Sequence, residues 1–169
     1  MAATEDESEV LRYLETITSE RNTDVESFLH ENAVKNEKRD FTRTSLLIDE
    51  QNNHQIIGYF TLLIKTFQLD KQISKRIRKK LTGDKNAHAF NAILIAQLGR
   101  SDAYKGHING DVILEYALGN CALVYDLIGL RIVCVEYADI KYLNDFYLKN
   151  KFNLLQVNEN EKNLAFVRF

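Results

Sequence analysis

The stretch that decides the fold reads QLGRSDAYKGHING, from Gln97 to Gly110. Before it, residues 90–98 form a continuous apolar run, which is typical of a central β-strand covered on both faces. After it, residues 111–128 form an apolar segment of helical length, and Gly129 suits the C-terminal end of that helix. Residues 130–137 are rich in Ile and Val and predict a second buried strand. Strand, loop, helix and strand together predict a β-α-β unit.

The chain before this unit predicts helices followed by a hairpin. Apolar residues recur at helical spacing over residues 9–20 and 25–39, which predicts two helices. Residues 42–49 and 55–67 are β-rich and are separated by a polar segment, so they predict two antiparallel strands. A basic helix with a narrow apolar stripe is expected next, because every fourth residue is apolar at Leu69, Ile73, Ile77 and Leu81.

The chain after this unit predicts a helix and a second hairpin. Asp139 can cap a helix over residues 140–150, and residues 152–157 and 164–169 read as closing strands. Hairpins on both sides of one crossover predict a mixed sheet. The expected fold is therefore α/β, with a central mixed sheet flanked by helices. No proline and no repeat marks a linker, so residues 1–169 are expected to form a single domain.

Composition narrows the cellular setting. The formal net charge is −2, so any contact with a polyanion must come from a local patch. No apolar run approaches the roughly 20 residues that span a bilayer, and the N-terminus lacks the parts of a signal peptide. A cytoplasmic protein without membrane contact is therefore expected. Cys121 and Cys134 lie in apolar surroundings without metal-ligand spacing, which predicts buried, reduced thiols and no metal site.

The loop from Gly99 to Gly110 has a composition suited to ligand binding. It holds three of the seven glycines, which allow backbone N–H groups to approach a ligand closely. The N-terminus of the following helix favours a phosphate or pyrophosphate. The loop fits neither common nucleotide fingerprint, and a tight structural turn is the alternative.

The segment Tyr104 to Gly110 resembles the pyrophosphate loop of GNAT acetyltransferases, whose pattern is Q/R-x-x-G-x-G/A. Lys105 takes the first position and Gly110 the last, while Ile108 stands where the middle glycine is expected. The resemblance implies that acetyl-CoA is the cosubstrate and that the loop binds it through Lys105, Gly106, His107, Ile108, Asn109 and Gly110. It also implies that backbone groups of Leu98, Gly99 and Arg100 pair with the pantetheine amides. The Arg100 side chain is either a phosphate contact or a solvated charge.

A second segment, Asn144 to Phe152, is similar to the GNAT C-terminal signature A-x-x-F-Y-x-K-x-G-F, with Asn144 in place of the common alanine. It matches at four positions, with Lys151 in place of the glycine, and the matches are Phe146, Tyr147, Lys149 and Phe152. The resemblance implies that Tyr147 is the catalytic acid that protonates the departing thiolate. A phenol with a pKa near 10 is protonated at neutral pH and can do so. The alternative is a core tyrosine whose hydroxyl is satisfied elsewhere.

The first half follows the GNAT order of helix and hairpin, in residues 25–33, 42–48 and 57–62, and it looks most like the toxin-type branch. That branch acetylates the amino acid of charged tRNA, so the resemblance implies aminoacyl-tRNA as acceptor. It also makes an antitoxin protein and a second copy of the chain candidate partners.

Residues 71–80 are the one segment whose composition indicates a binding partner. This segment contains six basic side chains and no acid, a density that can follow a nucleic-acid backbone. The acceptor contacts expected from it are Arg76, Arg78, Lys79 and Lys80. A solvated helix face is the alternative. No sequence pattern identifies a general base. Glu136 is a candidate, and the competing interpretation is that it is a surface carboxylate or is paired with a cation.

These patterns predict an N-acetyltransferase that moves an acetyl group from acetyl-CoA to an amine, with the amino acid of charged tRNA as preferred acceptor. Two alternatives stay open. One is acetylation of a small amine or a protein amine. The other is a non-catalytic acyl-CoA binding module with a regulatory role on the same fold.

Overall fold

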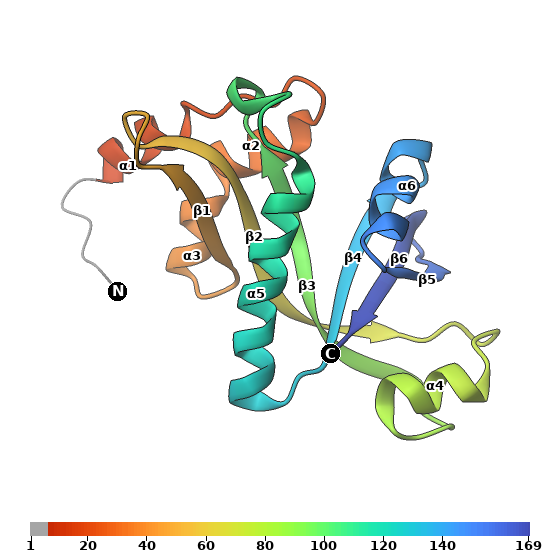
Figure 1. The fold of residues 1–169 in the computed structure, drawn as a ribbon. Coiled ribbons are helices and arrows are strands. Elements are labelled where there is room, and N and C mark those ends of the chain that lie inside the picture. Colours follow the sequence, from red (N-terminus) through yellow and green to blue (C-terminus); the bar gives the residue numbers. More distant parts are fainter. Residues whose placement is uncertain (1–6) are drawn as a thin grey trace. The chain divides into compact units, whose positions relative to one another are not determined.

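The computed structural model describes residues 7–169 (Figure 1). Its helices are α1 (Glu7–Leu14), α2 (Thr23–Glu31), α3 (Ala33–Lys38), α4 (Lys75–Thr82), the 3-10 turn η1 (Asp102–Tyr104), α5 (Gly110–Ile128) and α6 (Lys141–Lys149). Its strands are β1 (Arg43–Asp49), β2 (Gln55–Gln68), β3 (Ala89–Arg100), β4 (Ile132–Ala138), β5 (Asn153–Val157) and β6 (Lys162–Arg168). The N-terminal residues 1–6, for which no signal peptide was expected, lie outside the described range.

The six strands form one mixed sheet in the order β1-β2-β3-β4-β6-β5. The pair β3 and β4 is parallel, with Leu94 opposite Cys134. Antiparallel pairs join β1 to β2, β4 to β6 and β5 to β6. A parallel pair needs a long crossover, which α5 supplies, whereas consecutive antiparallel strands such as β1 and β2, or β5 and β6, need only a short turn. The mixed α/β sheet expected from the sequence is therefore confirmed.

Two compact units divide the chain, and each is built from two segments. The N-terminal unit holds the described residues up to Leu62 together with Gln97–Ala117. The C-terminal unit holds Leu63–Ala96 together with Leu118–Phe169. The strands β2 and β3 and the helix α5 each contribute residues to both units. That the whole chain behaves as one domain stays a prediction.

The core of the N-terminal unit lies between its helices and the hairpin β1–β2. Its buried residues include Leu14, Ile17, Leu29, Ile56 and Tyr59. The first expected helix ends at Leu14, because Thr16, Ile17 and Thr18 are β-branched and disfavour a helix. The second expected helix is two helices, α2 and α3, which meet at Asn32. Asn is a weak helix former, and no other feature of the pattern marks this break.

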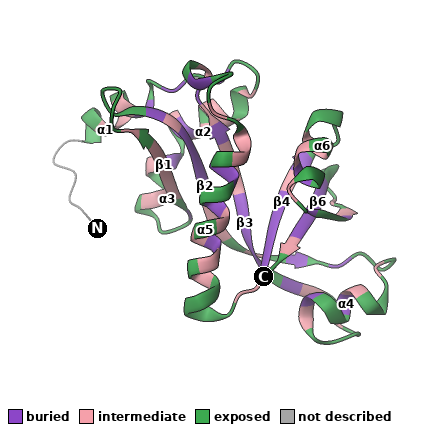
Figure 2. Cartoon of the chain, in the orientation of Figure 1, coloured by how far each residue is buried: buried purple, intermediate pink, exposed green. Residues whose placement is uncertain are grey.

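The core of the C-terminal unit is a second apolar cluster, visible as the buried stretches of β4 and β6 in Figure 2. It contains Leu69 and Leu81, and Ile73 and Ile77 pack against it. The expected basic helix nevertheless begins only at Lys75. Ser74 caps it, because its hydroxyl accepts a hydrogen bond from the Ile77 N–H. The segment before Ser74 turns instead, with the Ile73 N–H donating to the Asp70 carbonyl at 3.0 Å.

Both cysteines are free and buried, as expected. Burial raises the pKa of the Cys121 thiol to about 12, so the unreactive thiol form prevails at neutral pH. Burial also raises the pKa of Cys134. In the described part of the chain, no helix is long and apolar enough to cross a membrane.

Candidate functional site

The glycine loop leaves the end of β3 in the N-terminal unit. Gly58 on β2 and Gly99 on β3 allow an unusually close approach, since a Cβ at Gly58 would lie 2.5 Å from the Gly99 carbonyl oxygen. The backbone then turns with the Ser101 N–H donating to the Ile57 carbonyl at 2.9 Å. The Asp102 N–H donates to the Thr18 carbonyl at 2.8 Å. These bonds hold the strand end where the expected contacts Leu98, Gly99 and Arg100 lie.

The loop itself folds around the carbonyl of Tyr104. That oxygen accepts hydrogen bonds from the N–H groups of His107 at 3.1 Å and Ile108 at 3.0 Å. Gly106, which directly precedes His107, has a φ of +84°, a left-handed conformation that favours glycine. The side chains of Lys105, His107 and Asn109 are exposed. The loop residues expected to bind the cosubstrate thus form one compact turn.

Two side chains anchor this turn, the buried Tyr104 and the half-buried Arg100. The Tyr104 hydroxyl donates to Asp49 Oδ2 at 2.9 Å, which ties the loop to β1. The Arg100 Nη1 donates to the Ile108 carbonyl at 2.9 Å. Arg100 therefore braces the loop, an arrangement that differs from a freely solvated charge. Its Nε is buried and has no hydrogen-bond partner among the described residues.

Helix α5 begins at Gly110, directly after this turn. The first N–H groups of any helix have no intrahelical acceptor, and the helix dipole adds partial positive charge there. Lys105 and the Arg100 guanidinium add full positive charges in the same unit. The arrangement of turn and helix start is suited to an anion such as a pyrophosphate.

Tyr147 lies on α6 in the C-terminal unit, and its ring is held by other rings. The ring centroids of Tyr137 and Phe152 lie 4.6 and 5.5 Å from its own, and the side chain is only 8% exposed. No described residue forms a hydrogen bond with its hydroxyl. Burial, and then the phenols of Tyr137 and Tyr142, raise the pKa of Tyr147. The phenol is therefore protonated at neutral pH.

A polar network supports Tyr137, and sequence patterns did not reveal it. The buried Asn163 on β6 lies opposite Tyr137 in the β4–β6 register. Asn163 Nδ2 donates to Asn144 Oδ1 at 3.1 Å and to Asp139 Oδ1 at 3.3 Å. The sequence predicted that Asp139 caps α6, but this prediction is wrong, because Ile140 occupies the N-cap position. The Asp139 carboxylate is instead used between α6 and β6.

Glu136 is a paired carboxylate. Its Oε2 accepts a hydrogen bond from Lys65 Nζ at 2.6 Å, and its Oε1 accepts one from Asn158 Nδ2 at 2.6 Å. Both oxygens are thus engaged, which favours the structural interpretation over a role as general base.

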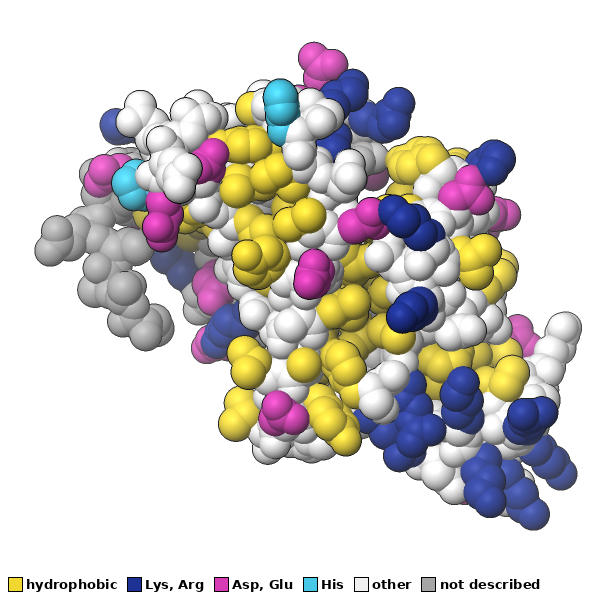
Figure 3. Space-filling view, viewed as in Figure 1, with side chains coloured by type: hydrophobic (Ala, Val, Ile, Leu, Met, Phe, Trp, Pro, Cys, Tyr) yellow, Lys and Arg dark blue, Asp and Glu magenta, His cyan; other side chains and the backbone are white. Residues whose placement is uncertain are grey.

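Helix α4 presents most of its basic side chains to solvent. Arg76, Lys79 and Lys80 are exposed, and no carboxylate of the described chain pairs with them. Figure 3 shows these dark blue side chains gathered over α4. Arg78 differs, since it is 8% exposed and points inward. Its guanidinium donates to the carbonyls of Ile73, Ala87 and Asp70 at 2.9, 2.6 and 2.6 Å.

Arg78 is therefore revised from an expected acceptor contact to a structural residue. Of the four basic residues named from the sequence, Arg76, Lys79 and Lys80 stay candidates for contact with an acceptor. The loop residues Leu98 to Gly110 share the N-terminal unit, whereas Tyr147 and α4 belong to the C-terminal unit.

Solved structures with the same fold include those of the toxin AtaT and of KacT. AtaT complexed with acetyl-methionyl-tRNAfMet matches with a TM-score of 0.74 and 21% identity, over 92% of this chain and 86% of that chain. A tyrosine-to-phenylalanine mutant of KacT matches with a TM-score of 0.73 and 19% identity, over 92% of this chain and 86% of that chain. An AtaT mutant bound to the C-terminus of the antitoxin AtaR and acetyl-CoA matches with a TM-score of 0.69 and 19% identity, over 92% and 84%.

No protein-family model matches the chain, and no curated protein matches it in sequence. Identities near 20% establish the fold and leave the activity to be argued from this chain's own residues. The structural likeness confirms the resemblance found in the sequence motifs. The chain has the GNAT fold, in the form that the toxins AtaT and KacT share.

Proposed function

We propose that the chain is a cytoplasmic N-acetyltransferase that moves an acetyl group from acetyl-CoA to an amine, with the amino acid of charged tRNA as preferred acceptor. The observation that carries the proposal is the Tyr147 hydroxyl. It lies at the signature position of a GNAT fold, it is protonated, and no described residue forms a hydrogen bond with it. A proton donor held ready in this way is what the departing thiolate requires.

The glycine loop fits the cosubstrate. The orphaned Arg100 Nε is a buried cationic donor beside the start of α5, which suits a bound anion. In the proposal, the turn from Lys105 to Gly110 holds the pyrophosphate, and the backbone of Leu98, Gly99 and Arg100 pairs with the pantetheine amides. An AtaT structure with acetyl-CoA bound supports this assignment.

The transfer needs few groups from the protein. Acetyl-CoA supplies the acetyl group as a thioester. The acceptor nitrogen forms a bond to the carbonyl carbon while the bond from that carbon to sulfur breaks. Tyr147 donates its proton to the sulfur, the acceptor amine loses a proton to water, and water returns a proton to the Tyr147 phenolate once the products leave. The α-amino group of an aminoacyl ester has a low pKa, so a strong general base is unnecessary, in agreement with the paired state of Glu136.

The acceptor class is proposed from the exposed cations of α4, with support from AtaT complexed with acetyl-methionyl-tRNAfMet. An antitoxin protein is proposed as partner, since AtaT binds the C-terminus of AtaR. A homodimer is a further proposal. The direct test incubates the protein with labelled acetyl-CoA and separate pools of charged tRNA, peptides and polyamines. Label on peptides or polyamines alone would favour the first alternative acceptor, and no transfer with retained acetyl-CoA binding would favour a regulatory module.

Gly106→Ala is expected to weaken acetyl-CoA binding. The φ of +84° is unfavourable for alanine by about 1 kcal/mol, so the turn relaxes away from the conformation that aims its N–H groups. Isothermal calorimetry with acetyl-CoA measures the loss.

Gly129→Ala is the matched control for this prediction. Gly129 also has a positive φ, +72°, and space for a methyl group, but it ends α5 far along the chain from the loop. Both variants should lose similar stability, and only Gly106→Ala should lose cosubstrate affinity. Equal affinities would remove the loop from the proposed binding site.

Replacing Arg76, Lys79 and Lys80 together by Gln is expected to weaken tRNA binding and flatten its salt dependence. Each neutralised phosphate contributes a slope of roughly −0.7 to −0.9 in log–log form, so losing three contacts should reduce the slope by about 2 to 3. Binding of charged tRNA at several salt concentrations measures this. A variant with Arg12, Lys35 and Arg39 changed to Gln removes the same charge from exposed positions of the N-terminal unit, and it should leave the slope unchanged.

A further inference from the structure

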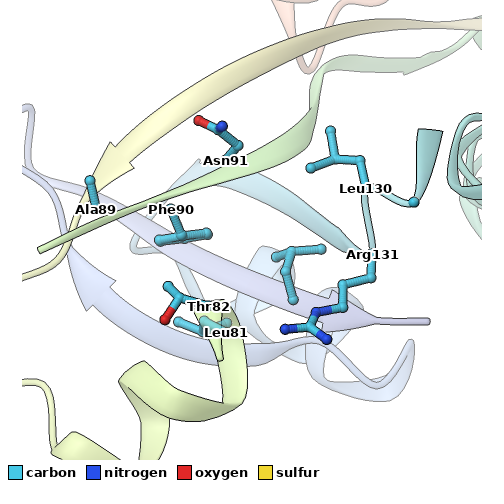
Figure 4. Close-up of a pocket in the computed structure, with 9 residues that line it drawn as sticks. Leu81, Thr82, Ala89, Phe90, Asn91, Leu130 and Arg131 are labelled. Carbon is cyan, nitrogen blue, oxygen red and sulfur yellow. The ribbon is translucent and has the colours of Figure 1, made fainter. Parts of the chain in front are cut away.

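An open cavity of about 330 Å³ lies in the C-terminal unit, beside α4 (Figure 4). Three segments line it: the end of α4, the start of β3 and the residues that lead into β4. Its lining includes Leu81, Phe90 and Ile132, which are buried and form an apolar floor. The cavity therefore lies at the N-terminal ends of β3 and β4, whereas α6 with Tyr147 follows the C-terminal end of β4.

Arg131 gives this cavity its charge. Figure 4 shows the Arg131 side chain extending toward Leu81 and Thr82. Among residues 7–169, no carboxylate forms an ion pair with it. The guanidinium carries five N–H donors and no acceptor, and its planar fork matches the oxygens of a phosphate. An unpaired guanidinium at an apolar cavity is thus suited to an anionic group attached to a flat or apolar body.

The cationic surface extends beyond α4 to the strand ends around this cavity. Ile132 lies opposite Arg168 in the β4–β6 register, and the Phe169 N–H donates to the Arg131 carbonyl at 3.0 Å. The Arg168 backbone therefore lies across from Ile132, one position along the chain from Arg131. Lys80 Nζ lies 5.6 Å from the ring centroid of Phe166, which connects α4 to the same end of β6. The exposed cations of α4 therefore continue into Arg131 and Arg168.

The separation from Tyr147 limits which acceptor can reach this surface. Tyr137, which stacks on Tyr147, lies five residues beyond Ile132 on β4. At about 3.3 Å per residue, the surface around Arg131 lies about 17 Å from the Tyr137 end of the strand. A small amine bound at Tyr147 cannot span this distance. A nucleic-acid strand, with phosphates about every 3.4 Å along its axis when stacked, spans it in about five nucleotides.

We propose that Arg131 and Arg168 bind backbone phosphates of the acceptor RNA about five nucleotides from its acylated end, with a nucleotide entering the cavity beside α4. This inference rests on the proposed function, because it takes aminoacyl-tRNA as the acceptor. It adds a second contact region that the basic helix alone does not contain. The region selects a long polyanion over a short acceptor with the same reactive amine.

The test compares the parent with a double variant that carries both Arg131→Gln and Arg168→Gln. The acceptors are charged tRNA and an aminoacylated trinucleotide that carries the same 3′ sequence. For tRNA, the slope of log binding constant against log salt should fall by about 1.4 to 1.8, and the KM should rise with kcat unchanged. The trinucleotide is too short to reach the cavity, so its kinetics should match those of the parent. Arg131→Lys keeps the charge and should retain most of the salt slope, which separates charge loss from loss of folding.

Each other outcome has a definite meaning. Unchanged tRNA kinetics in the double variant would overturn the inference, while activity of the parent on charged tRNA leaves the proposed function standing. Equal losses with tRNA and trinucleotide would overturn it too, because the effect would then act at the reacting amine. A parent that transfers acetyl groups to neither acceptor would defeat the proposed function itself. A variant with Lys35 and Arg39 changed to Gln controls for net charge and should behave as the parent.

Discussion

Tyr147→Phe is expected to lower turnover by about 10²- to 10⁴-fold, the range typical of a lost general acid, while acetyl-CoA affinity stays unchanged. The substitution deletes only the hydroxyl. The packing against Tyr137 and Phe152 stays in place, because those contacts are made by the ring. No hydrogen bond to a described residue is lost, so the midpoint of urea unfolding should not fall. Single-turnover transfer to charged tRNA measures the rate, and calorimetry measures the affinity.

Tyr125→Phe is the control, since Tyr125 on α5 is 39% exposed and its ring contact with Phe169 does not need the hydroxyl. It should transfer acetyl groups at the parental rate. Near-parental turnover in Tyr147→Phe would mean that another group protonates the thiolate. A matching loss of rate and cosubstrate affinity would make Tyr147 a packing or binding residue, and the proposed mechanism would be wrong.

Arg78→Met is expected to lower the free energy of unfolding by about 3 kcal/mol. Three carbonyl oxygens accept from the Arg78 guanidinium, and an acceptor left without its donor in a buried position costs about 1 to 3 kcal/mol. The lower end of that range applies, because Asp70 and Ala87 are themselves partly accessible. Methionine preserves much of the side-chain length without any donor. Urea unfolding at pH 7 measures the difference.

Arg76→Met tests whether the loss of stability expected for Arg78→Met comes from the burial of that arginine or from its place on α4. Arg76 is exposed on the same helix, so its loss should change stability by no more than about 0.5 kcal/mol. Arg78→Lys should recover only part of the stability, because an ammonium lacks the rigid planar fork with which the guanidinium donates to three carbonyls. If Arg78→Met keeps its stability and loses tRNA binding, Arg78 is an acceptor contact after all.

Local patterns were sufficient for most of the fold. The strand, glycine loop, helix and strand around residues 90–137 were correct within about two residues, because apolar runs, a helix-ending glycine and β-branched residues act over short distances. The start of α4 was wrong for an instructive reason. Leu69 and Ile73 face the same core as Ile77 and Leu81, so a turn followed by a capped helix shows the periodicity of one long helix.

What the sequence by itself determined is therefore the order of elements, the mixed sheet and the GNAT resemblance with its candidate acid, Tyr147. Only the tertiary structure decided which charges are available. Arg78 and Arg76 have the same side chain on the same helix, yet Arg78 is buried because carbonyls of Asp70, Ile73 and Ala87 surround it. Glu136 is likewise engaged by Lys65 and Asn158, which lie far from it in the chain. Burial and pairing depend on groups that folding brings together, and no short stretch of sequence contains that information.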